Sequence, residues 1–319
     1  MSELVNSFTL SNSQITTSSE CLRKYWFSRY GSWGGWISGA DERTKEIYRL
    51  KRLTGVYLWT GNRVHELIQE ILTVFVETGI IMPEEAAVEK LRETLRNEYR
   101  QSLTFKKGEN FPKGVVRFIE HDDDSRAIPP EKWKEVTDRA IDSIRGFYRS
   151  GVYSELINLP PTKLARENAI VRKDDVLETI LVNVDGRNVP VYVTIDVLMR
   201  DRDSEKYLVV DWKTGKEKKE SHDKQLGIYA MFVEEKFGAP PENISFAPVY
   251  LGYTPDKMST ITFTREKAKE TEEWIRSSAR ELLKRIEDPD KGVALEEKFP
   301  TNPGKFRCDW CEYKTVCPK

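Results

Sequence analysis

Apolar residues recur along the first half of the chain with the period of an α-helix. After Gly61 they fall at every third or fourth position and mark one face of an amphipathic helix, with Thr60 as a suitable N-cap. The stripe consists of Val64, Ile68, Ile71, Leu72 and Phe75. Similar patterns predict helices over 17–30, 83–101 and 130–149, and glycine-rich or polar sequence predicts loops over 31–39 and 106–130. The segment from about 40 to 155 is therefore predicted to be mainly helical.

The pattern changes after Pro160, where short runs rich in Val, Ile and Tyr replace the helical spacing. These runs predict strands over 166–172, 178–184, 189–199 and 206–212, with a hairpin turn at Asp185-Gly186. The later pattern predicts a helix over 220–237, strands over 244–252 and 257–263, and a long helix over 265–287. Together these elements predict a mixed α/β core that carries a helical insertion.

Composition narrows the class of protein. Hydrophobic residues make up 39% of the 319 residues, which suits a folded chain with a buried core. The 51 Lys and Arg nearly balance the 52 Asp and Glu, so any contact with nucleic acid must come from local patches. A run of about 18 apolar residues is absent, and the first residues lack the pattern of a secretory signal. We therefore expect a cytoplasmic chain with no membrane partner.

We expect residues 1–319 to form a single domain with four parts. These are an N-terminal helix with the first cysteine (1–39), a helical region (40–160), an α/β core (161–290) and a cysteine-bearing C-terminal segment (291–319).

The four cysteines stand at opposite ends of the chain. Cys308, Cys311 and Cys317 are close together at the C-terminus, and Cys21 lies far upstream. Four thiolates are the ligand set of a [4Fe–4S] cluster or of an all-cysteine zinc site. The arrangement of one plus three favours iron–sulfur, because zinc usually takes two close pairs, and zinc remains the alternative. Either metal would tie the two ends of the chain to the core.

Two acids and a lysine stand near the ends of two predicted strands. Asp196 follows one apolar run, and Asp211-Trp212-Lys213 ends the next. Asp211 and Lys213 are two residues apart, so both side chains leave the same face of a strand. Two carboxylates brought together repel, and a hard divalent cation relieves that repulsion. A neighbouring lysine can orient or deprotonate water and stabilise developing charge. The alternative is an ordinary strand end with solvated charges.

Other polar residues accompany this motif. His65 lies at the edge of the apolar stripe and is either a boundary residue or a third metal ligand. Gln225 and Tyr229 share one face of a predicted helix and either contact the site or, for Tyr229, belong to the core. Glu167 is a weaker candidate, for which a surface ion pair is the alternative.

Two basic segments are candidates for contact with a nucleic-acid strand. The first lies at and beyond the acid strand: Lys213, Lys216, Lys218, Lys219 and Lys224. The second, 23–36, mixes basic residues with aromatic residues that could stack on unpaired bases. The alternatives are a solvated loop for the first and packing around the cysteines for the second. The chain carries no phosphate-binding loop of the Walker type, so no motor is expected.

In order along the chain, these motifs resemble those of RecB-like PD-(D/E)XK nucleases: Gly61-x3-His65, Asp196, Asp211-Trp212-Lys213-Thr214-Gly215 and Gln225-x3-Tyr229. The cysteines and the segment Cys21-x-Arg23-Lys24-Tyr25 resemble the iron–sulfur branch. That branch includes the AddB nuclease domain, exonuclease V and CRISPR adaptation nucleases. The resemblance spans residues 11–318 and implies an α/β fold of restriction-endonuclease type, with a helical insertion and a terminal Fe–S clasp.

The resemblance also implies roles for the motif residues. His65, Asp196 and Asp211 would bind Mg²⁺ or Mn²⁺, Lys213 would act on the attacking water, and Gln225 and Tyr229 would hold the lysine or the phosphate. The implied activity is a metal-dependent DNA exonuclease that prefers single-stranded or frayed ends, in repair, recombination or defence. The alternatives are an end-trimming nuclease of the CRISPR adaptation type that works with protein partners, and a non-enzymatic DNA-binding protein.

Overall fold

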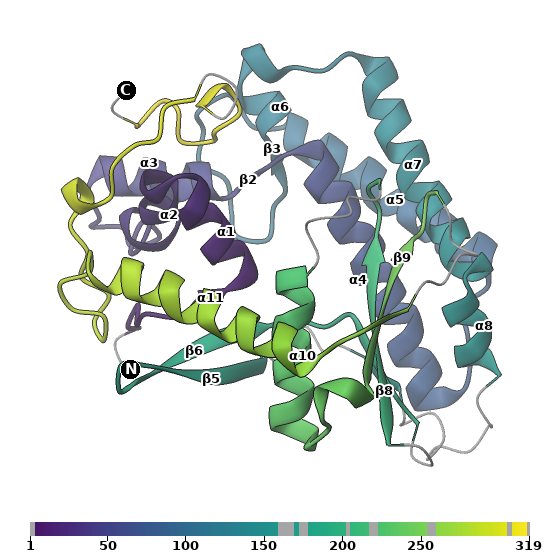
Figure 1. Cartoon of the computed structure of the whole chain (residues 1–319). Coiled ribbons are helices and arrows are strands. Elements are labelled where there is room, and N and C mark those ends of the chain that lie inside the picture. Colours follow the sequence, from purple (N-terminus) through teal and green to yellow (C-terminus); the bar gives the residue numbers. More distant parts are fainter. Residues whose placement is uncertain are drawn as a thin grey trace.

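A mixed five-stranded sheet forms the centre of the computed structural model (Figure 1). Its strand order is β10-β9-β8-β7-β4, and β8 pairs parallel with β9 and antiparallel with β7. The strands are β4 (Ala169–Val171), β7 (Val197–Asp201), β8 (Lys206–Lys213), β9 (Ile244–Tyr250) and β10 (Ile261–Thr262). The structure describes residues 4–158, 169–171, 178–201, 205–216, 223–253, 260–304 and 308–317.

A second sheet of three strands lies beside the first. It consists of β1 (Leu10–Ser11), β6 (Arg187–Val193) and β5 (Glu178–Val184), in the order β1-β6-β5. The predicted hairpin is confirmed: Asp185 and Gly186 take positive φ angles of 52° and 90°. The single strand predicted over 189–199 is wrong, because β6 ends at Val193 and pairs in this small sheet, whereas β7 belongs to the large one.

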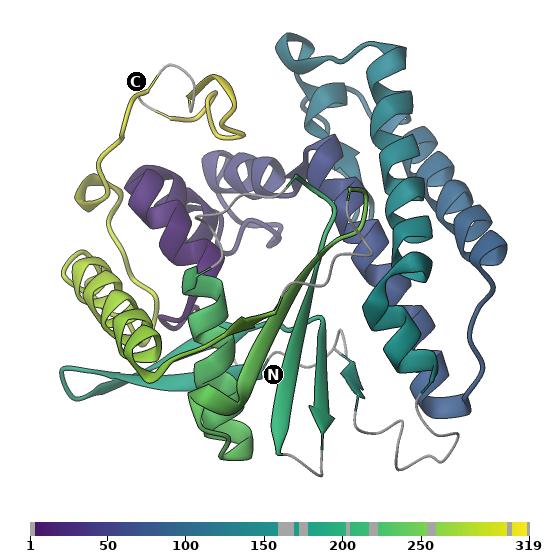
Figure 2. The ribbon, with the colours of Figure 1, turned by 45° about the vertical axis from the view of Figure 1, so that its right-hand side comes forward.

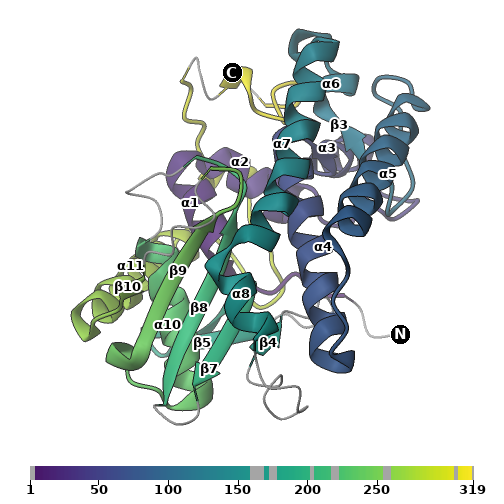
Figure 3. The same ribbon diagram turned by 90° about the vertical axis from the view of Figure 1, so that its right-hand side faces the viewer.

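Helices cover both faces of the central sheet (Figures 2 and 3). On one side lie α10 (Asp223–Phe237) and α11 (Arg265–Leu283), and on the other α4 (Val56–Thr78), α5 (Glu84–Leu103), α7 (Pro130–Arg149) and α8 (Gly151–Ile157). Strand β8 divides its residues between the two cores, since side chains alternate along a strand. Tyr207 and Val209 pack beneath α10 and α11. Val210 and Trp212 pack against the α4–α7 layer.

Helix α4 begins one turn earlier than the sequence pattern predicts. Gly55 precedes its first residue, and Thr60 lies inside the helix, where its hydroxyl donates to the Val56 carbonyl oxygen at 3.1 Å. Thr60 is therefore not the N-cap. The predicted stripe is confirmed: all five of its apolar residues are buried, and all but Phe75 belong to the core on the helical side of the central sheet. The helix ends at Gly79, whose positive φ of 78° suits glycine.

The N-terminal helices and the C-terminal segment lie side by side (Figure 1). The helix predicted over 17–30 is three pieces, α1 (Asn12–Glu20), α2 (Leu22–Trp26) and the π-helical turn η1 (Phe27–Gly31). The break falls at Cys21, whose backbone is extended and whose sulfur accepts from the Lys24 amide. Arg23 joins the two ends of the chain, because its Nε donates to the Phe299 carbonyl oxygen at 2.7 Å. Helix α3 (Glu42–Lys51) and the turn η4 (Glu296–Lys298) complete this region.

Short elements fill the segment predicted as a loop over 106–130. They are β3 (Arg117–Phe118), which pairs with β2 (Leu53–Thr54), then α6 (Ile119–Asp122) and η2 (Asp124–Arg126). A last short turn, η3 (Pro241–Asn243), precedes β9.

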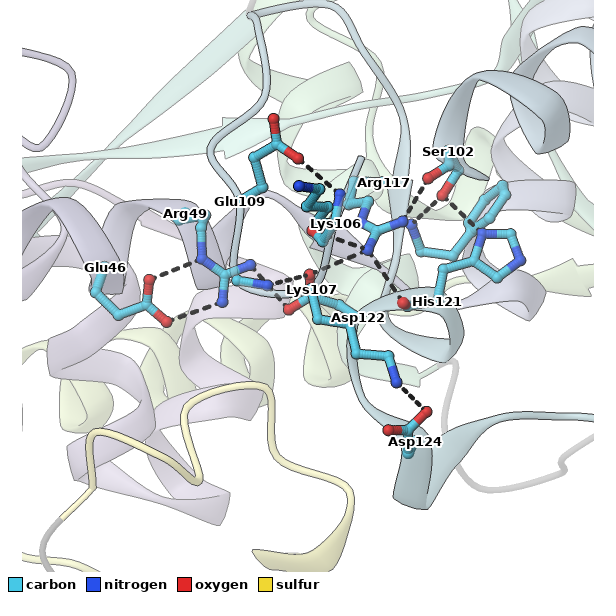
Figure 4. A network of polar contacts seen from close by, with 12 residues as sticks. Glu46, Arg49, Ser102, Lys106, Lys107, Glu109, Arg117, His121, Asp122 and Asp124 are labelled. Atoms are coloured by element: carbon cyan, nitrogen blue, oxygen red, sulfur yellow. Dashed lines mark hydrogen bonds and ion pairs between the residues drawn. The ribbon is translucent and has the colours of Figure 1, made fainter. Parts of the chain in front are cut away.

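A buried polar network fastens these short elements to α3 and α5 (Figure 4). The Arg117 guanidinium is 1% exposed and donates to the carbonyl oxygens of Ser102 and His121 and to Asp122. Arg49 binds the other oxygen of Asp122 at 2.8 Å. The Ser102 hydroxyl accepts from the Phe118 backbone amide and shares a hydrogen bond of 2.9 Å with Nδ1 of the His121 ring. Burial and the charge of Arg117 lower the pKa of His121 to about 4, so the ring is neutral at pH 7.

Candidate active site

Strand β8 carries Asp211 and Lys213 to the end of the central sheet. Both side chains alternate with Val210 and Trp212 and so point towards α10 rather than α4 and α7. Asp211 is buried, with 4% exposed surface. The Lys213 ammonium forms an ion pair with Asp211 Oδ2, an oxygen that makes no hydrogen bond of acceptable geometry. At Oδ2, the Asp211 carboxylate is therefore held by the ion pair with Lys213 and by no hydrogen bond.

Asp196 reaches the same place from the strand alongside. It directly precedes β7, whose first residue, Val197, lies opposite Val210 of β8. The next step of this antiparallel register brings Asp196 towards Asp211. Its Oδ2 accepts a hydrogen bond from the Trp212 backbone amide at 2.9 Å, which fixes the carboxylate at the sheet end.

His65 approaches from the helical layer. It lies on α4, and its Nδ1 is 3.2 Å from Asp196 Oδ1. Burial lowers the pKa of His65, but the hydrogen bond to Asp196 and the charges of both carboxylates raise it, and the net pKa lies above its ordinary value. The imidazole thus lies beside the acids, within hydrogen-bond distance of Asp196.

Helix α10 supplies the remaining pair. Gln225 Nε2 donates to Asp211 Oδ1 at 3.3 Å, and Gln225 Oε1 accepts from the Lys213 ammonium at 3.4 Å. The Tyr229 hydroxyl accepts from Gln225 and donates to Asp211 Oδ1 at 3.4 Å. Burial and the nearby carboxylates raise the pKa of Tyr229 well above its ordinary value, so it remains a neutral donor. The structure thus brings together the six predicted residues: His65, Asp196, Asp211, Lys213, Gln225 and Tyr229.

The two carboxylates share one low-dielectric corner. Burial raises the pKa of Asp211, the Lys213 charge lowers it and Asp196 raises it, with a net rise. Two carboxylates and an imidazole are donors that suit a divalent cation. Within the described ranges, however, no three His, Cys, Asp or Glu residues are grouped ready to hold a metal ion. In this arrangement the Lys213 ammonium pairs with Asp211, and the His65 ring contacts Asp196.

The four cysteines lie in the region where the two chain ends meet. Cys21 is near enough to raise the pKa of both Cys311 and Cys317 by charge repulsion, and Cys308 does the same to Cys317. Burial is the largest cause and raises the pKa of Cys311 to about 11. Cys21 is thus close enough to interact electrostatically with Cys311 and Cys317, although no group of three is arranged as a ready metal site in the part of the chain that the structure describes.

The aromatic residues of the basic segment 23–36 are mostly core residues. Tyr25, Trp26, Phe27 and Tyr30 are all buried, and Arg23 is engaged with the C-terminal segment. For these four rings the structure shows the alternative of packing, because they lie against one another and against Phe299 and Tyr313. Of its rings, Trp33 and Trp36 remain exposed.

Of the four predicted basic residues beyond β8, two lie among the described residues. Lys216 is exposed, and the Lys224 ammonium lies 5.9 Å from the centre of the Trp274 ring. Lys218, Lys219 and the weaker candidate Glu167 lie outside the described residues.

Two features of the site escaped sequence reasoning. The Trp212 amide that holds Asp196 belongs to the backbone, which no side-chain pattern reveals. The second is the approach of α4 to the loop after β8: a Cβ added to Gly61 would lie 3.2 Å from Thr214 Oγ1. A glycine inside a helix is the signal that could have indicated this approach.

A family model described as the PD-(D/E)XK nuclease superfamily matches residues 9–318. No curated protein matches. Among solved structures, one titled "Crystal structure of SSO0001" is similar at 17% identity, over 71% of this chain and 95% of that chain, with a TM-score of 0.32. None of the described helices is long and apolar enough to cross a membrane.

The family match includes both strands that carry the acids, the histidine helix and all four cysteines. Members of this superfamily are nucleases, which cleave phosphodiester bonds. Because the family model matches nearly the whole length of the chain, the chain belongs to the PD-(D/E)XK nuclease superfamily.

Proposed function

We propose that the chain is a Mg²⁺- or Mn²⁺-dependent DNA exonuclease that prefers single-stranded or frayed ends. The observation that carries the proposal is the convergence of Asp196, Asp211 and Lys213 at one end of the sheet in a member of a nuclease superfamily. An ordinary strand end would leave these charges solvated, whereas Asp211 is buried.

Each residue of the site has a distinct role in this proposal. Asp196 and Asp211 would hold the cation, with His65 as a ligand from the helical side. The cation would polarise the phosphate and lower the pKa of a bound water. Lys213 would orient the attacking water and stabilise charge that develops on the phosphate. Gln225 and Tyr229, which contact Lys213 and Asp211, would keep both groups in position.

The four cysteines would hold a [4Fe–4S] cluster, with zinc as the alternative. Ligation requires thiolates, and the raised pKa of Cys311 means that metal binding must displace its proton. A cluster here would fasten α2 to the C-terminal segment, which already contact each other through Arg23.

We therefore expect protein purified without oxygen to be brown and to contain about four irons per chain. Cys311→Ala should lose the colour and unfold at a lower temperature, because a ligand that ties the chain ends is lost. Trp310→Ala is the matched control, since Trp310 is exposed beside Cys311 and supplies no ligand. Iron analysis and thermal unfolding measure both effects. Colourless wild-type protein with one zinc would overturn the iron assignment, and colourless protein without metal would overturn the cluster.

The proposed activity is tested with labelled substrates. With Mg²⁺ or Mn²⁺, end-labelled single-stranded DNA should be shortened from an end, and a chelator should stop the reaction. Closed circular duplex should be cut far more slowly, because it offers neither an end nor unpaired bases to exposed rings such as Trp33 and Trp36. Equal cutting of closed circles would instead indicate an endonuclease. Binding without cleavage of any substrate would favour the non-enzymatic alternative. Proteins that copurify with the chain would show whether it works in a repair or defence complex.

A further inference from the structure

A small cavity adjoins the candidate active site on the side of the helical layer. Its volume is about 100 Å³, and it lies between α4, α7 and the loop after β8. The residues that line it are Tyr57, Thr60, Gly61, Val136, Arg139, Ala140, Ser143, Thr214 and Gly215. At about 30 Å³ per water, this space holds roughly three waters, which is room for a phosphate group but not for a whole nucleotide.

The position of the cavity relates it directly to the acids. Gly61 precedes His65 by one turn of α4, about 6 Å along the helix axis. Thr214 follows Lys213 in the chain. This offset is comparable to the separation between neighbouring phosphates of an extended strand. A strand whose phosphate lies at the acids would therefore place an adjacent unit at the cavity.

The polar groups of the cavity suit an anion. Arg139 is the cationic residue of the lining, and the lining contains no acid. The guanidinium pairs with Glu135 at 2.8 Å, one turn earlier on α7, and 37% of the Arg139 side chain remains exposed. An exposed pair of this kind contributes little to stability, so the guanidinium is available to a stronger anionic partner. The Thr214 hydroxyl, close to Gly61, offers a second polar group.

The rim of the cavity carries an exposed aromatic ring. Tyr57 is 49% exposed, although it lies in the first turn of α4, where a solvent-facing residue needs no ring. The Lys132 ammonium, which like Arg139 pairs with Glu135, lies 6.0 Å from the ring centre. Exposed rings and cations beside a groove are the features with which proteins hold single strands, by stacking and by charge.

We propose that this cavity is a subsite for the nucleotide next to the one cleaved, with the phosphate at Arg139 and Thr214 and an unpaired base against Tyr57. The proposal rests on the proposed nuclease function, because it assigns the strand a path through the same site. A duplex keeps its bases stacked and cannot offer one to Tyr57, so the subsite selects unpaired DNA.

The test measures binding of a fluorescent single-stranded oligonucleotide in the presence of a chelator, where no cleavage is needed. Arg139→Ala should weaken binding about tenfold, and the plot of log affinity against log salt should become shallower by about 0.7, as for one lost phosphate contact. Tyr57→Ala should also weaken binding about tenfold, but without a change of slope, because stacking is uncharged. A blunt duplex should show little effect of Tyr57→Ala.

Two matched variants serve as controls. Arg145 lies on α7 outside the cavity lining, pairs with Asp142 and is 39% exposed, so Arg145→Ala removes an equivalent surface charge. Leu58→Ala removes an exposed apolar side chain beside Tyr57. Oligonucleotides with a 5′-phosphate or a 5′-hydroxyl distinguish a terminal from an internal phosphate: a loss restricted to the phosphorylated strand assigns a terminal phosphate, and an equal loss assigns an internal one.

The outcomes distinguish an error in the proposed subsite from an error in the proposed nuclease function. If Arg139→Ala and Tyr57→Ala bind like their controls while the wild type cleaves, the subsite is wrong and the nuclease stands. If the wild type does not cleave but the variants lose binding as described, the subsite stands as a strand-binding site alone.

Discussion

Lys213→Ala should cleave DNA at least about 10²-fold more slowly than the wild type and still bind DNA and Mn²⁺. The reason is that the lysine contacts the acids without being a metal ligand, so its loss removes charge stabilisation from the chemical step alone. Single-turnover cleavage of end-labelled DNA measures the rate, and anisotropy measures binding. Lys206→Ala, at the exposed start of the same strand, is the control and should cleave normally.

The same variant has a predictable effect on stability. Without the lysine, the buried Asp211 loses its ion pair, and a buried unpaired carboxylate is destabilising. The unfolding temperature of the variant without metal should therefore be lower than that of the wild type. Mn²⁺ should restore it, since a cation replaces the missing charge. Cleavage by Lys213→Ala at the wild-type rate would show that Asp211 and Lys213 are an ordinary strand end.

Arg117→Ala should lower the free energy of unfolding by about 3–5 kcal/mol, the largest effect that we expect outside the active site. The variant leaves the carbonyl oxygens of Ser102 and His121 without a donor and removes one cation from the buried Asp122 (Figure 4). Urea unfolding followed by circular dichroism measures the change. Arg96, exposed on α5, is the matched control, and Arg96→Ala should change stability by less than about 0.5 kcal/mol. A loss of similar size in both variants would mean that the network adds nothing specific.

Local patterns in the sequence predict the parts of the site that depend on one element. The alternation of side chains along β8 places Asp211 and Lys213 on the same face of the strand. The period of α10 places Gln225 and Tyr229 on the same face of the helix. The structure confirms both, since the two pairs contact each other. These predictions succeed because side-chain direction follows from strand and helix geometry alone.

Features that depend on contacts between distant segments are not visible in the sequence. The run over 189–199 contains no turn signal, yet its first half pairs with β5 in the small sheet and its second half pairs with β8 in the central sheet. The start of α4 at Val56 depends on Glu120, which accepts a hydrogen bond from the Val56 amide across 64 residues of chain. Similarly, the sequence of 23–36 suggests a binding surface, but Phe299 and Tyr313 from the other end of the chain pack against Tyr25 and Phe27.

Calorimetric titration of Mn²⁺ tests the central claim, that Asp196 and Asp211 form a site for a divalent cation. The wild type should bind with a saturable heat, and Asp211→Ala should lose that heat because an essential ligand is gone. Asp142→Ala, which removes an exposed acid on α7, should bind Mn²⁺ like the wild type. A wild type that binds no Mn²⁺, or an Asp211→Ala variant that binds it equally well, would contradict the account.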